Sequence, residues 1–162
     1  MHYSQIRKFD TANGTGIRTT LFVSGCTKEC KDCFNDAYKS FTTGYVWDEV
    51  IEKNFLAHIN SPIIQGVSIL GGEPMDQIMD DTLLNLVKKI SKNIWIYSGY
   101  TFEEIINNKK RYEIIKHCDV LVDGPYIDKL KDLRLAFVGS SNQRIINIQK
   151  SLDCNEIVLL KL

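Results

Sequence analysis

Short apolar segments alternate along the chain with longer stretches in which apolar residues recur every three or four positions. The short segments are rich in β-branched and aromatic residues, which predicts strands. These strands are expected at residues 19–23, 67–70, 94–97 and 120–122, with weaker candidates at 135–138, 145–148 and 156–160. The longer stretches have helical spacing and predict helices at residues 48–59, 83–90 and 101–116, the last interrupted near 107–108. Thr101 and Glu104 have the spacing of a capping box, which is typical of a helix start.

The alternation of strands and helices predicts the fold class α/β, with a parallel sheet that is open or curled into part of a barrel. A complete eightfold barrel takes roughly 250 residues. The chain has 162 residues, so we expect an incomplete, open β/α barrel. No repeat or linker divides the sequence, and residues 1–162 are therefore expected to form a single domain.

Composition narrows the classes of partner. Lys and Arg together number 20, as do Asp and Glu, so the net charge is zero and the general electrostatic signature of nucleic-acid binding is missing. No apolar run approaches the roughly 20 residues that span a bilayer, and the first residues lack the apolar segment of a signal peptide. Five cysteines, an odd number, favour a reducing compartment over a disulfide framework. We therefore expect a cytoplasmic protein with no nucleic-acid or membrane partner.

Each of the four main predicted strands is followed by a short polar or glycine-rich cluster. Parallel sheets place their active sites at the carboxyl ends of the strands, so these clusters are expected to share one rim. In chain order they are residues 26–33, Gly71-Gly72-Glu73-Pro74, Ser98-Gly99-Tyr100 and Asp123-Gly124-Pro125-Tyr126.

The first cluster contains three cysteines, Cys26, Cys30 and Cys33. Three thiolates at this spacing can hold one metal centre and leave a coordination position open for chemistry. A structural zinc site would need a further ligand pair at short spacing, and none of the other Cys or His residues is paired in that way. Zinc stays the less favoured alternative. Cys118 and Cys154 each adjoin an apolar segment, and both are expected in the core.

The Cys-x3-Cys-x2-Cys run after one strand, followed by Gly-Gly-Glu-Pro after the next, resembles the radical S-adenosylmethionine (SAM) enzymes. The resemblance implies that Cys26, Cys30 and Cys33 hold a 4Fe–4S cluster whose fourth iron is chelated by SAM. It also implies that the loop Gly71-Gly72-Glu73-Pro74 meets the SAM amino group, with Ser98 in the same cofactor-binding set.

Physical chemistry agrees with these implied roles. Gly71 and Gly72 lack a Cβ, so the backbone can approach a ligand closely. Glu73 can accept hydrogen bonds from an ammonium group, and Pro74 stiffens the turn.

The resemblance places the stretch around the third cysteine against the adenine of SAM, which makes Asp32 and Phe34 cofactor-binding candidates. Many members of the family have an aromatic residue immediately before this cysteine. Asp32 stands there in this chain, so the role of its side chain is open.

The stretch Asn13-Gly-Thr-Gly-Ile-Arg-Thr19 resembles the entry segment of the activating-enzyme branch of this family. Three later stretches resemble the members of that branch that activate the anaerobic ribonucleotide reductase. They are Ile94-Trp-Ile-Tyr-Ser-Gly-Tyr100, Asp119-Val-Leu-Val-Asp-Gly-Pro-Tyr126 and Gly139-Ser-Ser-Asn-Gln-Arg144. Val138 stands where that branch usually has an arginine. Arg18 is a catalytic candidate because it is expected near the negatively charged thiolates, and Asp123 is a second one.

This resemblance implies that reductive cleavage of SAM yields a 5′-deoxyadenosyl radical, which takes hydrogen from a glycine of the anaerobic ribonucleoside-triphosphate reductase. The implied electron donor is a flavodoxin-like protein. Two alternatives stay open: an activase of another glycyl radical enzyme, of the pyruvate formate-lyase type, and a non-catalytic zinc or iron–sulfur module.

Overall fold

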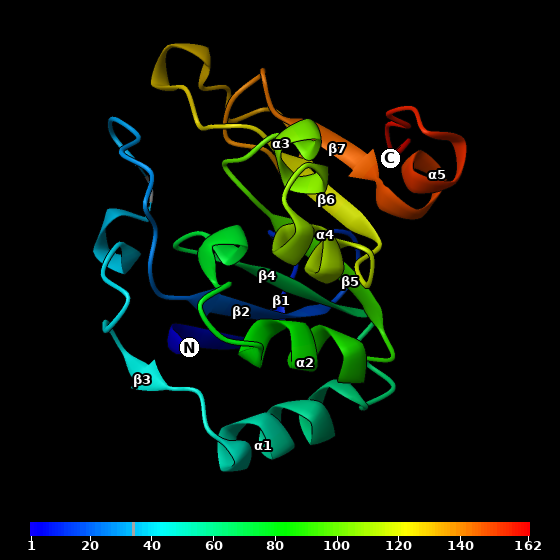
Figure 1. Cartoon of the computed structure of the whole chain (residues 1–162). Coiled ribbons are helices and arrows are strands. Elements are labelled where there is room, and N and C mark those ends of the chain that lie inside the picture. The colour runs from blue at the N-terminus through cyan, green and yellow to red at the C-terminus, as the bar shows by residue number, and fades with distance from the viewer. Residues whose placement is uncertain (34) are drawn as a thin grey trace.

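The computed structural model describes residues 1–33 and 35–162, and its centre is one mixed sheet (Figure 1). Seven strands form the sheet in the order β3-β1-β2-β4-β5-β6-β7. Their bounds are β1 (His2–Asp10), β2 (Arg18–Val23), β3 (Tyr45–Val46), β4 (Gly66–Gly71), β5 (Asn93–Tyr97), β6 (Val120–Asp123) and β7 (Arg144–Asn147). The four neighbours β2, β4, β5 and β6 run parallel, whereas β1, β3 and β7 pair antiparallel to their neighbours. In the described part of the chain β3 and β7 are the two edges, so the sheet is open.

Five helices connect or follow the strands of this described structure. They are α1 (Glu49–Ile59), α2 (Thr82–Lys89), α3 (Phe102–Ile106), α4 (Lys109–Ile115) and α5 (Ile148–Cys154). The predicted capping box is present at α3, where Thr101 and Glu104 satisfy each other's backbone N–H groups. The predicted interruption follows from Asn108, whose side chain accepts from the Arg111 N–H and starts α4 as a new helix. Among the described residues, no helix is both long and apolar enough to cross a membrane.

The two faces of the sheet have different cores. Strand residues such as Leu21, Ile69 and Ile96 point toward the helices, where they pack with Phe55 of α1 and Leu86 of α2. Figure 1 shows α1 and α2 side by side along this face. The opposite face carries a smaller apolar cluster of Trp95, Val120 and Val122, covered by irregular backbone that includes Phe137 and Val138.

The weaker strand predictions are confirmed only in one case. Residues 145–148 correspond to β7, but residues 156–160 form a single bridge, between Leu159 and Ile146. Residues 135–138 form no strand, because Phe137 has a φ of +62° and its ring packs edge-on against Trp95. Strand β1 was not predicted, since irregularities in its pairing with β2 break the apolar alternation. Helix α5 was not predicted either.

Arg18 begins β2 and ties three parallel strands together. Its Nε donates to Ser68 Oγ at 2.8 Å, and its Nη2 donates to the carbonyl oxygens of Val67 (2.7 Å) and Asn93 (3.0 Å). The guanidinium also lies 5.5 Å from the ring of Trp95. Burial lowers the pKa of Arg18 to about 10, which leaves the side chain charged at neutral pH. A buried cation satisfied by carbonyl groups is a structural element of the sheet.

We predict that Arg18→Lys lowers the free energy of unfolding by about 2–4 kcal/mol, because a lysine cannot reproduce the forked donation and leaves buried carbonyls unpaired. Urea unfolding of the metal-free protein measures the effect. The matched control is Arg134→Lys, since the Arg134 side chain is 90% exposed. Equal midpoints for the two variants would contradict this role.

Candidate functional site

A cavity of about 520 Å³ lies at the carboxyl ends of the parallel strands. Its volume is within the range of small-molecule sites. Backbone and side chains from all four strand ends line it, including Cys26, Cys30, Cys33, Gly71, Gly72, Glu73, Ser98, Gly99 and Gly124. The expectation that the polar clusters share one rim is therefore confirmed for these residues.

The cysteine loop is fixed at its start by backbone hydrogen bonds. Gly25 N–H donates to the Tyr38 carbonyl at 2.7 Å, and Cys26 N–H donates to the Lys39 carbonyl at 3.0 Å. Burial raises the pKa of Cys26 to about 11 and also raises the pKa of Cys30. Both thiols are therefore protonated in the metal-free protein, and metal binding must release their protons.

The three cysteines stay the candidate ligands of the metal centre. All three are partly exposed and line the same cavity. Within the described residues, no three His, Cys, Asp or Glu side chains are grouped so as to hold one metal ion. In a cube each thiolate binds a different iron, so the thiolates need not converge on one point.

One cavity residue has a polar group without a partner. The hydroxyl of Tyr97 is buried and makes no hydrogen bond to any described residue, and Tyr97 lines the cavity. Burial raises the pKa of Tyr97, so this phenol keeps its proton and can donate it to a polar ligand.

The structure requires glycine at positions 71 and 72 for a reason other than the predicted approach of a ligand. A Cβ on Gly71 would lie 2.4 Å from the Val23 carbonyl oxygen, and a Cβ on Gly72 would lie 2.4 Å from that of Gly25. Gly71 also has a φ of +117°. The two glycines therefore let their loop pack directly against the start of the cysteine loop, and a contact with a ligand stays a prediction.

Glu73 is fully buried and accepts three hydrogen bonds. Its Oε1 accepts from Met75 N–H (2.9 Å) and Ser98 Oγ (2.7 Å), and its Oε2 accepts from Gly99 N–H (2.7 Å). Burial raises the pKa of Glu73 to about 7 in spite of these donors. The carboxylate thus joins the ends of β4 and β5, while its predicted contact with an ammonium group stays a prediction. Pro74 begins the following 3-10 turn η2 (Pro74–Asp76).

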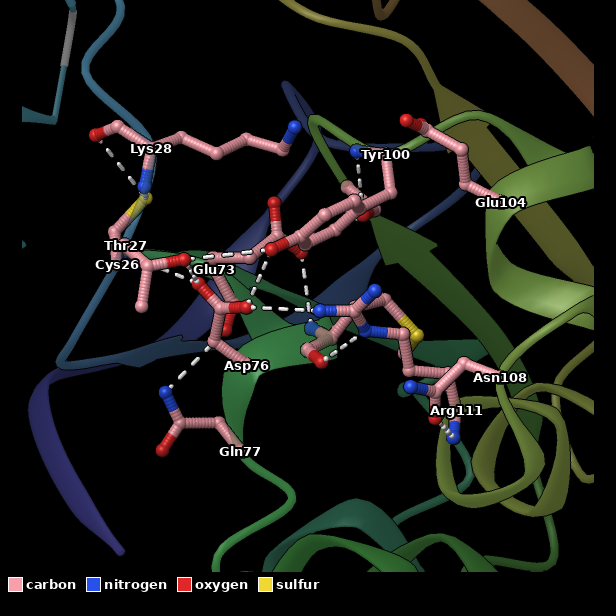
Figure 2. Close-up of polar contacts among 12 residues, drawn as sticks. Cys26, Thr27, Lys28, Glu73, Asp76, Gln77, Tyr100, Glu104, Asn108 and Arg111 are labelled. Atoms are coloured by element: carbon pink, nitrogen blue, oxygen red, sulfur yellow. Dashed lines mark hydrogen bonds and ion pairs between the residues drawn. The ribbon is translucent and has the colours of Figure 1, made fainter.

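A second carboxylate, Asp76, connects the cysteine loop to α4 (Figure 2). Its Oδ2 accepts from both the N–H and the hydroxyl of Thr27 at 2.8 Å. Its Oδ1 accepts from the Tyr100 hydroxyl at 2.8 Å and lies 3.3 Å from Nη2 of Arg111. We call the set Thr27, Asp76, Tyr100 and Arg111 the latch.

The Tyr100 ring of the latch lies between two cations, as Figure 2 shows. The Arg111 guanidinium carbon is 3.7 Å from the ring centre, and Lys28 Nζ is 3.8 Å from it. Arg111 also donates to the Met75 carbonyl at 2.9 Å. Thr27 and Tyr100 belong to clusters that the sequence analysis identified, but the set as a whole was not predicted, because Arg111 occupies an ordinary polar position of a helix and Asp76 belongs to no motif.

Arg18 does not take the place expected for it, whereas Asp123 lies at the carboxyl end of β6 as expected, and its catalytic role stays a prediction. Arg18 is at the start of β2, whereas the cysteines follow its end, and it lines a separate hollow of about 540 Å³ with Gln65 and Asn93. The expected position near the thiolates was therefore wrong. Asp123 ends β6, is 1% exposed and pairs with Arg144 while accepting from Phe102 N–H at 2.7 Å.

The stretch 139–144 is bound to the end of β6. Gln143 Nε2 donates to the Gly124 carbonyl at 3.1 Å, and Asn142 Nδ2 donates to the Pro125 carbonyl at 2.8 Å. Gln143 Oε1 accepts from Gly139 N–H at 2.8 Å. The motif thus holds the long connection between β6 and β7, and Val138 within that connection lines the cavity.

The remaining residues singled out in the sequence are Asp32, Phe34 and the two cysteines outside the cluster motif. Asp32 is exposed and has a φ of +55°, a conformation that Asp tolerates better than bulky residues. Phe34 is outside the described residues, so its contact with adenine stays a prediction. Cys118 is fully buried, as predicted. Cys154 is exposed at the end of α5, so its predicted place in the core was wrong.

Comparison with known proteins identifies the class first. A protein-family model described as a 4Fe-4S single cluster domain matches residues 12–146. This match defines the chain as an iron–sulfur protein with one cluster domain.

Individual relatives give the family within that class. The chain is 37% identical over 152 residues to the anaerobic ribonucleoside-triphosphate reductase-activating protein of Haemophilus influenzae, covering 90% of this chain and 97% of the relative. It is 35% identical over 156 residues to the protein of that name from Escherichia coli K12 (92% and 100%), and 34% identical over 150 residues to that of phage T4 (90% and 93%). The chain belongs to the family of anaerobic ribonucleoside-triphosphate reductase-activating proteins.

Glu73 is predicted to make the stability of the metal-free protein depend on pH. Its folded-state pKa of about 7 is above the ordinary value of 4.5, so between these values the folded state holds a proton that the unfolded state has lost. The free energy of unfolding therefore falls as pH rises through this window, by about 1–3 kcal/mol. Urea unfolding from pH 4.5 to 8 should show this fall in the wild type and in Glu156→Gln, an exposed control, but not in Glu73→Gln. The same slope in all three proteins would contradict the assignment.

The latch is predicted to retain iron. Asp76→Ala removes the acceptor for Thr27 and Tyr100, which frees the cysteine loop, so iron should be lost to a chelator about tenfold faster after anaerobic reconstitution. The control Asp80→Ala removes an exposed carboxylate and should lose iron at the wild-type rate. Equal rates for both variants would show that the latch does not support the metal centre.

Proposed function

We propose that this protein is a radical SAM enzyme that generates the glycyl radical of an anaerobic ribonucleoside-triphosphate reductase. The observation that carries the proposal is the shared cavity at the carboxyl ends of β2, β4 and β5. Three cysteines from one strand end face this cavity together with Gly71, Gly72 and Glu73 from the next. The relatives of the chain bear the name of reductase-activating proteins, which agrees with such a site.

In this proposal Cys26, Cys30 and Cys33 bind a 4Fe–4S cluster, and SAM occupies the rest of the cavity. When bound, the reduced cluster would supply one electron to the sulfonium of SAM, which would break into methionine and a carbon-centred radical. Iron–sulfur potentials reach roughly −700 mV, so a cluster reduced by an external donor can supply such an electron. A flavodoxin-like protein is the proposed donor, and the cytoplasm, which keeps thiols reduced, is the proposed location.

The side chains of this protein bind and orient the cofactor in the proposal. Arg7 and Lys28 are the basic residues among those that line the cavity, so they provide positive charge for a carboxylate. The unpartnered hydroxyl of Tyr97 provides a donor. An apolar part of the cavity wall, formed by Phe22, Leu70 and Phe137, excludes water from a reactive intermediate.

The open sheet supports a macromolecular substrate. We propose that the parallel run β2-β4-β5-β6 is the incomplete barrel of the radical SAM class, and that residues 1–162 act as one domain. An incomplete barrel leaves its side accessible, and a glycine in a loop of a large protein needs that access more than a small molecule does.

Anaerobic mixing of the reduced, reconstituted protein with SAM and the reductase is expected to give the electron paramagnetic resonance doublet of a glycyl radical. Cys30→Ala should abolish the doublet, because two thiolates do not hold the cluster. Cys154→Ala, which removes an exposed cysteine far along the chain, should leave it unchanged. A doublet of full size from Cys30→Ala would contradict the assignment of the cluster.

Two further measurements separate the alternatives. Metal analysis should find about four irons with sulfide, whereas about one zinc without sulfide would support a zinc module instead. Replacing the reductase by a pyruvate formate-lyase should remove the doublet, and a doublet with that enzyme alone would assign the activase to another glycyl radical enzyme.

A further inference from the structure

A long connection between β6 and β7 extends from the end of the sheet that holds the cavity. We call residues 126–138 of this connection the arm, which is gold to orange in Figure 1. It contains one 3-10 turn, η3 (Asp128–Leu130), and no strand. Large apolar side chains are exposed along it, with Leu130 at 41% and Leu133 at 83%, and with Ile127 and Leu135 also exposed. All four lie within residues 127–135, and neighbouring exposed apolar side chains are typical of protein–protein contacts.

Hydrogen bonds to the stretch 139–144 fix the part of the arm that carries Ile127 and Leu130. Ile127 N–H donates to Ser140 Oγ at 3.2 Å, and Ser141 N–H donates to the Leu130 carbonyl at 2.9 Å. Lys131 and Ser140 form an antiparallel bridge. Since this part of the arm is fixed in this way, Ile127 and Leu130 stay on the outside in the folded protein.

The arm is also a wall of the cavity. Tyr126, Leu135 and Phe137 line it, as do the three cysteines. Leu135 is exposed and also lines the cavity, and Leu130 and Leu133 precede it by a few residues in the same connection. A glycine that enters the cavity from outside belongs to a protein whose neighbouring surface must lie against this rim.

The charges of the arm favour a protein over other occupants. Three basic residues (Lys129, Lys131 and Arg134) are interspersed with two acidic ones (Asp128 and Asp132). A membrane surface or a nucleic acid would call for a cluster of basic residues without such acidic neighbours. A mixed polar rim around apolar side chains is the composition of a protein interface.

We propose that the arm is a docking surface for the reductase, with Leu130 and Leu133 inserted into an apolar recess of that protein. The inference rests on the proposed function, because the occupant is the protein whose glycine reaches the cavity. Leu130 and Leu133 do not line the cavity, so their role is to bind the partner, and the chemistry within the cavity is independent of them.

The test is the double variant Leu130→Ser/Leu133→Ser, with Ile63→Ser/Met79→Ser as the matched control. Ile63 and Met79 are 58% and 88% exposed and lie outside the arm. Glycyl radical formation is measured against reductase concentration, and binding to immobilised reductase is measured separately. The arm variant is expected to need at least about tenfold more reductase for half-maximal activation and to bind correspondingly more weakly, since two apolar side chains no longer leave water. The control should match the wild type.

Three measurements on the arm variant alone make the outcome specific. Its iron content, its thermal midpoint and its reductase-independent cleavage of SAM should equal those of the wild type. A loss of that cleavage would mean that the arm shapes the cavity, which would overturn the docking role. An unchanged requirement for reductase would overturn it as well.

Self-association and failure of the proposed function are recognised by separate results. If light scattering shows a wild-type dimer that the arm variant dissociates, while activation is unchanged, the arm is a contact between two copies and the proposal is wrong. If the wild type produces no glycyl radical with the reductase, the proposed function and the docking role both fall. A radical in the wild type with equal activation by the arm variant overturns only the docking role.

Discussion

The site depends on a contact between backbones that only glycine permits. Two adjacent parallel strands, β2 and β4, end in loops that turn toward the same cavity. Gly72 N–H donates to the Val23 carbonyl and Glu73 N–H donates to the Gly25 carbonyl, both at 2.8 Å. Any side chain at Gly72 would collide with the Gly25 carbonyl and separate the loops. Because Gly72 has no Cβ, its loop can lie directly against the start of the cysteine loop, and this contact positions the cysteines relative to the rest of the cavity.

Two buried carboxylates extend this contact across the sheet. Glu73 reaches from β4 to the end of β5, where Ser98 and Gly99 donate to it. Asp76 reaches from the same loop back to Thr27 between the cysteines and forward to Arg111 on α4. Each loop at the cavity is thus held by groups on its neighbours. These hydrogen bonds between neighbouring loops give the site the rigidity that cofactor binding requires.

The sequence predicted the parts of the fold that depend on local pattern. The parallel strands were recognisable because β-branched residues such as those of Val120–Asp123 are buried on both faces, and the break between α3 and α4 because Asn108 favours a cap over a helix interior. Strand β1 was not recognisable, since its pairing with β2 is irregular. The common rim followed from topology alone. The partners of Asp76 and Arg18 depend on contacts between residues 24 to 75 positions apart, which no local pattern encodes.

Antiparallel pairing of β7 with β6 ends the parallel run after four strands and leaves the cavity wall to the irregular arm. All three cysteines are partly exposed. A dissolved oxygen molecule is much smaller than the cavity of about 520 Å³ that these cysteines line. Exposed thiols and iron–sulfur centres are open to oxidation. We therefore expect air to inactivate this site once a cluster is bound.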